Sequence, residues 1–182
     1  RPSARASRSS HAARSSPAIG RVMGKPVAAG FFITTAVTVL NAFTTRAPRA
    51  EPERRILLAT APAEQHSFGV LVVEQFFRGA GWNVWSGAGL ERSDILEAAH
   101  RIWFGVAGFS LACEDHVGSL ATLIRDVRRA SRNPGLGILV GGPVFIENPQ
   151  LVALVGADAT AADGRQATLQ AETMLALLGR DA

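Results

Sequence analysis

The feature that most constrains the fold is an alternation, from residue 54 onward, of short aliphatic runs with stretches of helical period. This alternation is typical of βαβ units, in which crossover helices join parallel strands. The aliphatic runs predict strands at residues 56–61, 82–86, 102–110, 136–140 and 157–162. The remaining stretches predict helices at residues 69–80, 91–101, 117–131 and 151–155, and a last helix capped by Asp163.

Five strands with intervening helices favour a flavodoxin-like doubly wound α/β domain, with a five-stranded parallel sheet of order 2-1-3-4-5. The run 102–110 is apolar almost throughout, as expected of a central strand buried on both faces. In this order the topology switches between the first and third strands, and ligands bind beside the carboxyl ends of the strands at such a point. The loops expected there are residues 64–69 and 110–116.

Helical spacing also predicts which side chains face the core. Phe76 and Leu177 fall on inward positions of their helices, and Ser93 is a candidate N-cap of the helix 91–101. The other inward positions are Val73, Phe77, Ala80, Ile95, Leu96, Ala99, Leu120, Leu123, Ile124, Val127, Met174 and Leu178.

Charge and composition divide the chain into three parts. Residues 1–50 carry eight of the 19 Lys and Arg residues and none of the 15 Asp and Glu residues. Residues 1–22 are rich in Arg, Ser and Ala and predict a disordered basic leader, because they offer little apolar surface to bury. Residues 23–53 contain an apolar segment and a linker of uncertain structure, and residues 54–182 form the predicted domain.

The first two parts allow several interpretations. The leader could be a targeting peptide or an arm that contacts DNA, but a solvated tail is the simpler interpretation. The apolar segment, residues 26–43, is poor as a membrane span because Gly30 and four Thr or Asn residues interrupt it, so we expect it to pack on the domain or to be loosely ordered. Cys113 is the single cysteine, which excludes an internal disulfide and fits a cytoplasmic location.

A histidine follows the first predicted strand, where the topology switches. His66 lies two residues after Glu64 and three before Gly69. Neutral imidazole is a ligand for transition metals, and a carboxylate that accepts its other N–H fixes the tautomer. We therefore expect His66 to be a metal ligand oriented by Glu64. The alternative is that His66 is an ordinary polar residue of a surface loop.

Three parts of the sequence stand at the spacing of a known family. They are Glu64-x-His66-x-x-Gly69, then Ser110-x-Ala112, and then Gly141-Gly142. They resemble the signature Asp-x-His-x-x-Gly, Ser-x-Leu and Gly-Gly of the cobalamin-binding domain, over about residues 54 to 180. Glu64 departs from the Asp of that signature, and Ala112 departs from its Leu.

The resemblance implies a domain that binds cobalamin, or haem in its place, with His66 as the metal ligand. It also implies a slot between the sheet and the helices that takes the nucleotide tail. Glycine at the edges of the slot would let backbone approach the tail closely, and Ser110 could donate a hydrogen bond. The implied cofactor-binding residues are Glu64, His66, Ser67, Phe68, Gly69, Ser110, Leu111, Ala112, Gly141, Gly142 and Pro143.

Two longer sequence segments, residues 61–69 and 76–82, are similar to the sensor domains of the AerR/PpaA and AppA antirepressors of purple photosynthetic bacteria. This resemblance implies a regulatory module that signals light or redox state to a transcriptional repressor and is not itself an enzyme. The alternatives are a corrinoid carrier or small subunit of a cobalamin-dependent methyltransferase or mutase, and an interaction domain without a cofactor.

Other polar residues have simpler interpretations. Cys113 and His116 lie at the same rim, but we interpret them as a buried small side chain and a solvated residue near a helix start. The arginines of the helix 117–131 could dock an acidic partner or DNA, although a solvated helix face is the simpler prediction.

Overall fold

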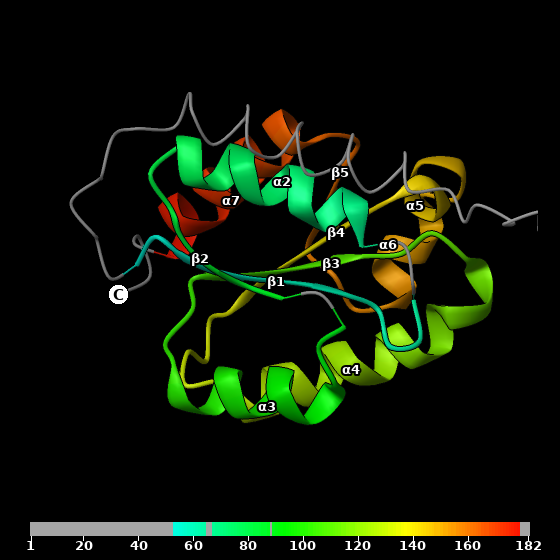
Figure 1. Cartoon of the computed structure of the whole chain (residues 1–182), viewed down its shortest axis with the longest axis horizontal. Helices are drawn as coiled ribbons and strands as arrows, with labels where there is room; N and C mark the ends of the chain where they lie inside the picture. Colours follow the sequence, from blue (N-terminus) through cyan, green and yellow to red (C-terminus); the bar gives the residue numbers. More distant parts are fainter. Residues whose placement is uncertain (1–52, 65–66, 88, 179–182) are drawn as a thin grey trace, which may run out of the picture.

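The structure is a computed structural model that describes residues 53–64, 67–87 and 89–178. Its strands form one parallel sheet in the order β2-β1-β3-β4-β5 (Figure 1). This confirms the predicted flavodoxin-like doubly wound fold. The strands are β1 (Arg55–Thr60), β2 (Asn83–Ser86), β3 (Val106–Ser110), β4 (Gly137–Gly141) and β5 (Ala159–Ala161).

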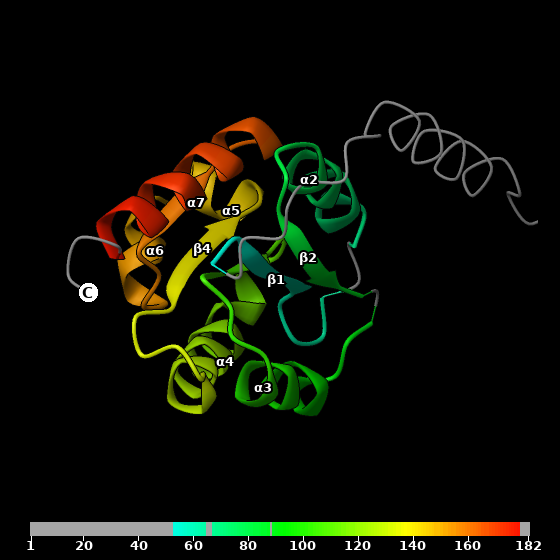
Figure 2. The same ribbon diagram turned by 90° about the vertical axis from the view of Figure 1, so that its left-hand side faces the viewer.

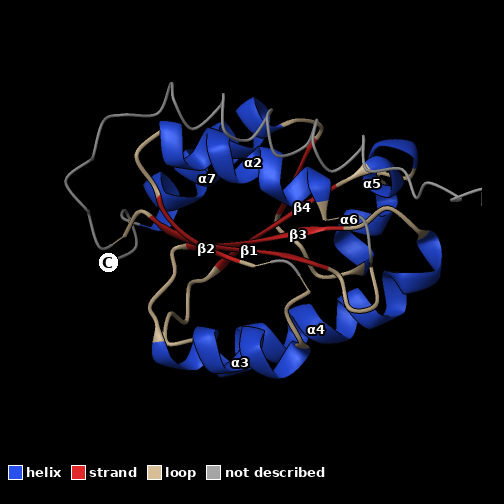
Figure 3. Ribbon diagram, in the orientation of Figure 1, coloured by secondary structure: helices blue, strands red, loops and turns tan. Residues whose placement is uncertain are grey.

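Helices cover both faces of the sheet (Figures 2 and 3). One face carries α2 (Phe68–Gly79) and α7 (Gly164–Leu178), and the opposite face carries α3 (Arg92–Arg101) and α4 (Val117–Ala130). The remaining elements are short and lie in the connections after β3 and β4, namely η1 (Glu114–His116), α5 (Pro143–Glu147) and α6 (Gln150–Leu154).

The strand register aligns the ends of the three central strands. Thr60 of β1 lies opposite Ser110 of β3, which in turn lies opposite Gly141 of β4. The ladder continues past the strands, because the Ala61 amide donates to the Ser110 carbonyl at 2.9 Å and the Leu111 amide donates to the Gly141 carbonyl at 3.0 Å. The three segments singled out in the sequence therefore begin beside one another at the carboxyl edge.

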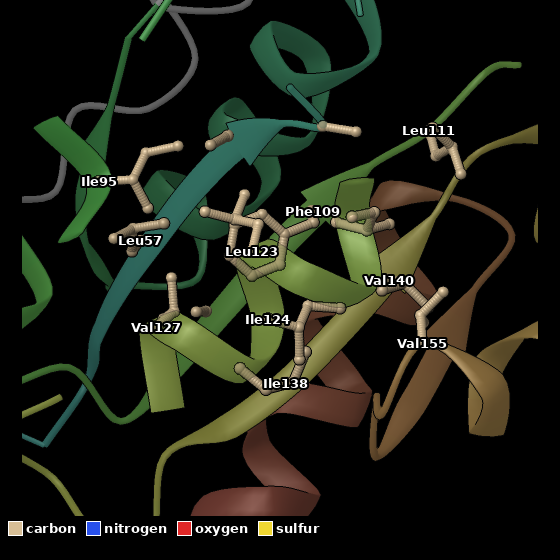
Figure 4. Close-up of a cluster of buried hydrophobic side chains, with 14 of the residues drawn as sticks. Leu57, Ile95, Phe109, Leu111, Leu123, Ile124, Val127, Ile138, Val140 and Val155 are labelled. Carbon is tan, nitrogen blue, oxygen red and sulfur yellow. The ribbon is translucent and has the colours of Figure 1, made fainter. Parts of the chain in front are cut away.

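Strand alternation divides the core into two clusters, since successive side chains point to opposite faces. Leu57 and Phe109 face α3 and α4, where they pack with the apolar stripe of α4 (Figure 4). Ile56 and Leu58 face α2 and α7, where the rings of Phe77 and Trp82 meet edge to face at 5.3 Å. The predicted stripe of α4 is confirmed as buried at Leu120, Leu123, Ile124 and Val127.

Three predicted core positions are wrong, and one of them, Ala80, is exposed just past the end of α2. Phe76 is 41% exposed and Leu177 is 57% exposed. The helix α2 is apolar on nearly every side, so hydrophobicity does not mark the face that meets the sheet. In α7 the buried face contains Ala171 and Met174. Helical spacing continues that face at position 178, so Leu177 lies next to the buried face and not on it.

Several element boundaries also differ from the prediction. The N-cap of α3 is Glu91 instead of Ser93, and the Glu91 amide donates to the Asp94 carboxylate at 3.1 Å in a capping box. Residues 102–105 are not part of a strand, because they carry the chain from the end of α3 to the start of β3. The helix α5 was not predicted.

Some sequence predictions lie outside the described residues. These are the disordered leader, residues 1–22, and the apolar segment, residues 26–43. Within the described part of the chain, none of the helices has both the length and the apolar character needed to span a bilayer.

Candidate functional site

A cavity of about 270 Å³ lies between the sheet and the helices α2 and α7. Its floor comes from alternate residues of the central strands, which point to this face. Its mouth residues, Ser110 and Gly141, lie at the carboxyl edge of the sheet. The complete lining is Leu58, Gly69, Val70, Val73, Gly108, Phe109, Ser110, Ala112, Leu139, Val140, Gly141, Gly142, Pro143, Ala161, Ala162, Asp163 and Ala167.

The cavity exists because small residues occupy the positions where its walls meet. Gly69 lines the cavity from the first turn of α2, and Ala167 lines it from α7. A side chain added at Gly69 would start 3.7 Å from the Ser110 hydroxyl oxygen, within the space of the cavity. Any larger residue at position 69 would therefore occupy volume that the present sequence leaves for a ligand.

The backbone conformation at position 142 requires glycine, and this requirement could not be predicted from the sequence. Its φ angle is 112°, a conformation that residues with a side chain rarely adopt. A Cβ atom at this position would also lie 2.1 Å from the carbonyl oxygen of Leu111. The connection after β4 can therefore pass closely over the connection after β3, and Pro143 can then start α5 at the cavity wall.

The Glu64 carboxylate joins two of the connections at this edge. Its Oε2 atom accepts a hydrogen bond of 2.9 Å from the backbone N–H of Ala112. The Glu64 amide donates to the carbonyl of Ala61 at 3.0 Å, and Ala63 between them has a φ of 65°. The connection after β1 is thus a tight turn anchored to the connection after β3. The longer reach of Glu relative to Asp suits this bond between loops.

The predicted metal ligand, His66, and its neighbour Gln65 lie outside the described residues. The metal ligation by His66 and the bond from its imidazole to Glu64 therefore stay predictions.

The structure gathers most of the other predicted site residues at one place. Ser67 is half-buried at the start of α2, where its side chain makes no capping bond, and Phe68 is 49% exposed. Leu111 is fully buried in the cluster that faces α4, because strand alternation turns it away from Ser110. The predicted residues that line the cavity are Gly69, Ser110, Ala112, Gly141, Gly142 and Pro143.

The walls of the cavity were not predicted from the sequence. Leu58, Leu139, Val70 and Val73 are apolar residues of regular elements, and nothing in the sequence distinguishes them from core residues. The far wall at Ala161 could have been found from topology, since Ala161 pairs with Gly141 across the β4–β5 ladder.

The cavity is lined mainly by carbon, with two polar side chains at its edge. Ser110 contributes a hydroxyl group, and Asp163 contributes a carboxylate. The Asp163 Oδ1 atom accepts a hydrogen bond of 2.8 Å from the amide of Gln166, so it caps α7 as predicted. Among the residues described, no three His, Cys, Asp or Glu side chains come together as a metal site. The lining suits a flat apolar group.

Among the arginines of α4, Arg128 contacts residues outside the helix, whereas Arg125 and Arg129 are exposed. Arg128 donates to both carboxylate oxygens of Asp158 at 2.8 Å. Asp126 accepts a hydrogen bond from Arg92 on α3, and this bond holds the pKa of the Asp126 carboxyl below its ordinary value. These contacts tie α4 to its neighbours.

The bond between Glu64 and Ala112 leads to a prediction. Replacing Glu64 with Ala removes the acceptor, so the Ala112 amide should exchange with solvent about tenfold faster, as a lost bond of roughly 1–1.5 kcal/mol implies. Replacing Glu64 with Gln keeps an acceptor oxygen and should restore most of the protection. Amide exchange followed by NMR measures both variants. Equal exchange rates in Glu64→Ala and the wild type would show that this bond does not anchor the loop.

Comparison with known proteins is consistent with this geometry. The sequence matches the family described as the B12 binding domain over residues 54–171. A search of curated proteins gives no significant match.

Two solved structures share the fold. The monomethylamine corrinoid protein of Methanosarcina barkeri superposes with a TM-score of 0.61 at 15% identity, over 78% of this chain and 65% of that protein. A cobalamin-binding protein from Desulfitobacterium hafniense DCB-2 gives a TM-score of 0.61 at 18% identity, over 79% and 70% of the two chains. This chain thus spans less than two thirds of the first protein. The family match covers more than half of the sequence and confirms the cobalamin prediction, so the chain belongs to the B12 binding domain family, whose cofactor is cobalamin.

Proposed function

We propose that this domain is a cobalamin-binding regulatory module in which His66 is the axial ligand of the metal. The observation that carries the proposal is the apolar cavity beneath the carboxyl edge. Three separate parts of the recognised signature, represented by Gly69, Ser110 and Gly141, line it together. His66 lies in the same connection as Gly69, and its imidazole can ligate a transition metal.

The size and chemistry of the cavity fit a part of the cofactor. Cavities of roughly 300–1,000 Å³ bury most of a drug-sized ligand, and cobalamin is larger than such ligands. A space of about 270 Å³ can therefore take the nucleotide tail while the corrin ring remains outside at the carboxyl edge. The carbon-lined walls suit the aromatic base of the tail, and the Ser110 hydroxyl can donate to one of its polar atoms.

The loop geometry supports the role given to His66. In the sequence, His66 lies between Glu64 and Ser67. Glu64 is hydrogen-bonded to Ala61 in the connection after β1 and to Ala112 in the connection after β3, and Ser67 is the N-cap of α2. A ligand carried on a short loop between two anchored ends loses little conformational freedom when it binds a metal. Bound cobalamin would supply a cobalt centre whose axial ligation responds to light and redox state.

A regulatory role explains the composition of the site better than catalysis by this chain alone. The described cavity residues are apolar or glycine apart from Ser110 and Asp163, and Asp163 is engaged at the start of α7. The sequence segments 61–69 and 76–82 resemble antirepressor sensor domains. We therefore assign a transcriptional repressor as the partner and the cytoplasm as the location, within the same proposal.

The second candidate is a corrinoid carrier that works with a methyltransferase or mutase. The fold shared with the Methanosarcina barkeri corrinoid protein favours it. In a carrier the cofactor performs the chemistry and the protein positions it for a partner enzyme. Corrinoid-dependent methyl transfer in a cell extract would support this candidate, whereas cobalamin-dependent binding to a repressor would support the sensor.

The assignment of His66 can be tested by cofactor retention. The wild-type protein incubated with hydroxocobalamin should keep the corrinoid through gel filtration, and His66→Ala should change the visible spectrum and lose most of the cofactor. His100→Ala serves as a control, because His100 is an exposed histidine of α3 on the opposite face of the sheet from the cavity. Full retention by His66→Ala with an unchanged spectrum would contradict the assignment.

The assignment of the cavity can be tested by filling it. Ala167 is 3% exposed on α7, and an Ala167→Phe side chain would extend into the space given to the tail. We expect this variant to remain folded and to retain at least about tenfold less cobalamin, as a blocked pocket implies. The exposed Ala176 on the same helix provides the matched control, Ala176→Phe, which should bind normally. Equal retention by both variants would exclude the cavity as the binding slot.

A further inference from the structure

The helix α2 has apolar side chains on the side that faces away from the sheet. Val70 and Phe77 are buried against the strands, as expected for the inner side of the helix. Phe68, Val72 and Phe76 follow one another at intervals of four residues and so lie on a common stripe. Phe68 and Phe76 are 49% and 41% exposed. We call Phe68, Val72, Gln75 and Phe76 the outer stripe.

Gln75 is the polar residue of this stripe. It stands five residues after Val70 and two before Phe77, which places it on the opposite side of the helix from both. Gln75 is nevertheless only 8% exposed, and its Oε1 atom has no hydrogen-bond partner in the described part of the chain. The exposed rings are those of Phe68 and Phe76, so the stripe is suited to an apolar covering segment.

The chain itself contains a segment of this composition. Residues 26–43 include no charged residue, and their apolar side chains are interrupted by Thr34, Thr35, Thr38 and Asn41. These four side chains can each donate a hydrogen bond, and the others can cover aromatic rings.

The path of the chain brings this segment within reach of the stripe. Arg54 contacts the C-terminal end of α2, since its Nη1 atom lies 3.5 Å from the carbonyl oxygen of Ala80. The nine residues 44–52 can extend by about 30 Å, at roughly 3.3–3.6 Å per residue. The helix α2 has 12 residues, which corresponds to about 18 Å at 1.5 Å per residue. The linker therefore reaches every part of the stripe, and the tether raises the effective concentration of the segment there.

We infer that residues 26–43 dock on the outer stripe of α2, where their apolar side chains cover the exposed rings of Phe68 and Phe76. The inner side of the same helix contributes Gly69, Val70 and Val73 to the cavity. The segment and the cofactor therefore contact opposite sides of one helix. If the proposed function holds, a shift of α2 on cofactor binding alters the affinity of the stripe for the segment, and the effect is reciprocal.

Hydrogen exchange of the full chain without cobalamin tests the docking. Peptides from residues 26–43 should exchange at least about tenfold more slowly than an unfolded peptide of that sequence, as expected for docked chain. The variant Val72→Glu, alone or with Phe76→Glu, should bring them to the unfolded rate. The single variant keeps the contact of Phe76 with Gly164 at the start of α7. Peptides from β1, β3 and β4 report that each variant is folded.

The matched control is Leu154→Glu, at an apolar residue of α6 that is 68% exposed and lies outside the stripe. It should leave the protection of residues 26–43 unchanged. The inference is overturned if those residues exchange at the unfolded rate in the wild type, or if Val72→Glu leaves them protected. Protection that disappears on dilution would identify a second copy as the occupant and would also overturn it.

The coupling to the cofactor has a separate readout. Hydroxocobalamin added to the wild type should change the exchange of residues 26–43, while gel filtration reports whether the corrinoid is retained. Unchanged exchange in protein that retains the corrinoid would overturn the coupling and leave the docking intact. Loss of the corrinoid would count against the proposed function instead.

Discussion

The site depends on the parallel hydrogen-bond ladder that joins β1, β3 and β4. Because the ladder fixes Thr60, Ser110 and Gly141 side by side, three segments separated by many residues in sequence emerge together at the carboxyl edge. The two backbone bonds beyond the strands and the bond from Ala112 to Glu64 extend this order into the connections. Loops tied in this way hold a binding geometry more firmly than loops joined only at their ends.

The same ladder determines which side chains reach the ligand. Alternation along β3 points Ser110 toward α2 and Leu111 toward α4, so adjacent residues of one signature have different roles. The small residues at the walls leave a space that a better-packed domain would fill with side chains. Such a space lacks dispersion contacts, so a group that enters it gains contacts and stabilises the folded state.

Much of this could be predicted from the sequence, because the strands are strongly apolar and the strand order follows from regular βαβ connections. The positions at strand ends, such as Ser110 and Gly141, were also accessible because topology places them at one edge. The walls at Val70 and Leu139 were not, since a residue that faces a cavity has the same composition as one that faces the core. The exposure of Phe76 was missed because α2 is apolar on both sides. The partner of Glu64 required the three-dimensional path of two loops.

The central claim is that His66 ligates the cobalt of bound cobalamin, and electron paramagnetic resonance tests it directly. The protein would be prepared with ¹⁵N-labelled histidine, loaded with cobalamin and reduced to the paramagnetic cobalt(II) form. Ligation by imidazole predicts a two-line nitrogen splitting in the labelled protein where unlabelled protein gives three lines, and loss of that signal in His66→Ala. A three-line splitting that persists with the label would show that the cofactor's own base remains bound and would contradict the account.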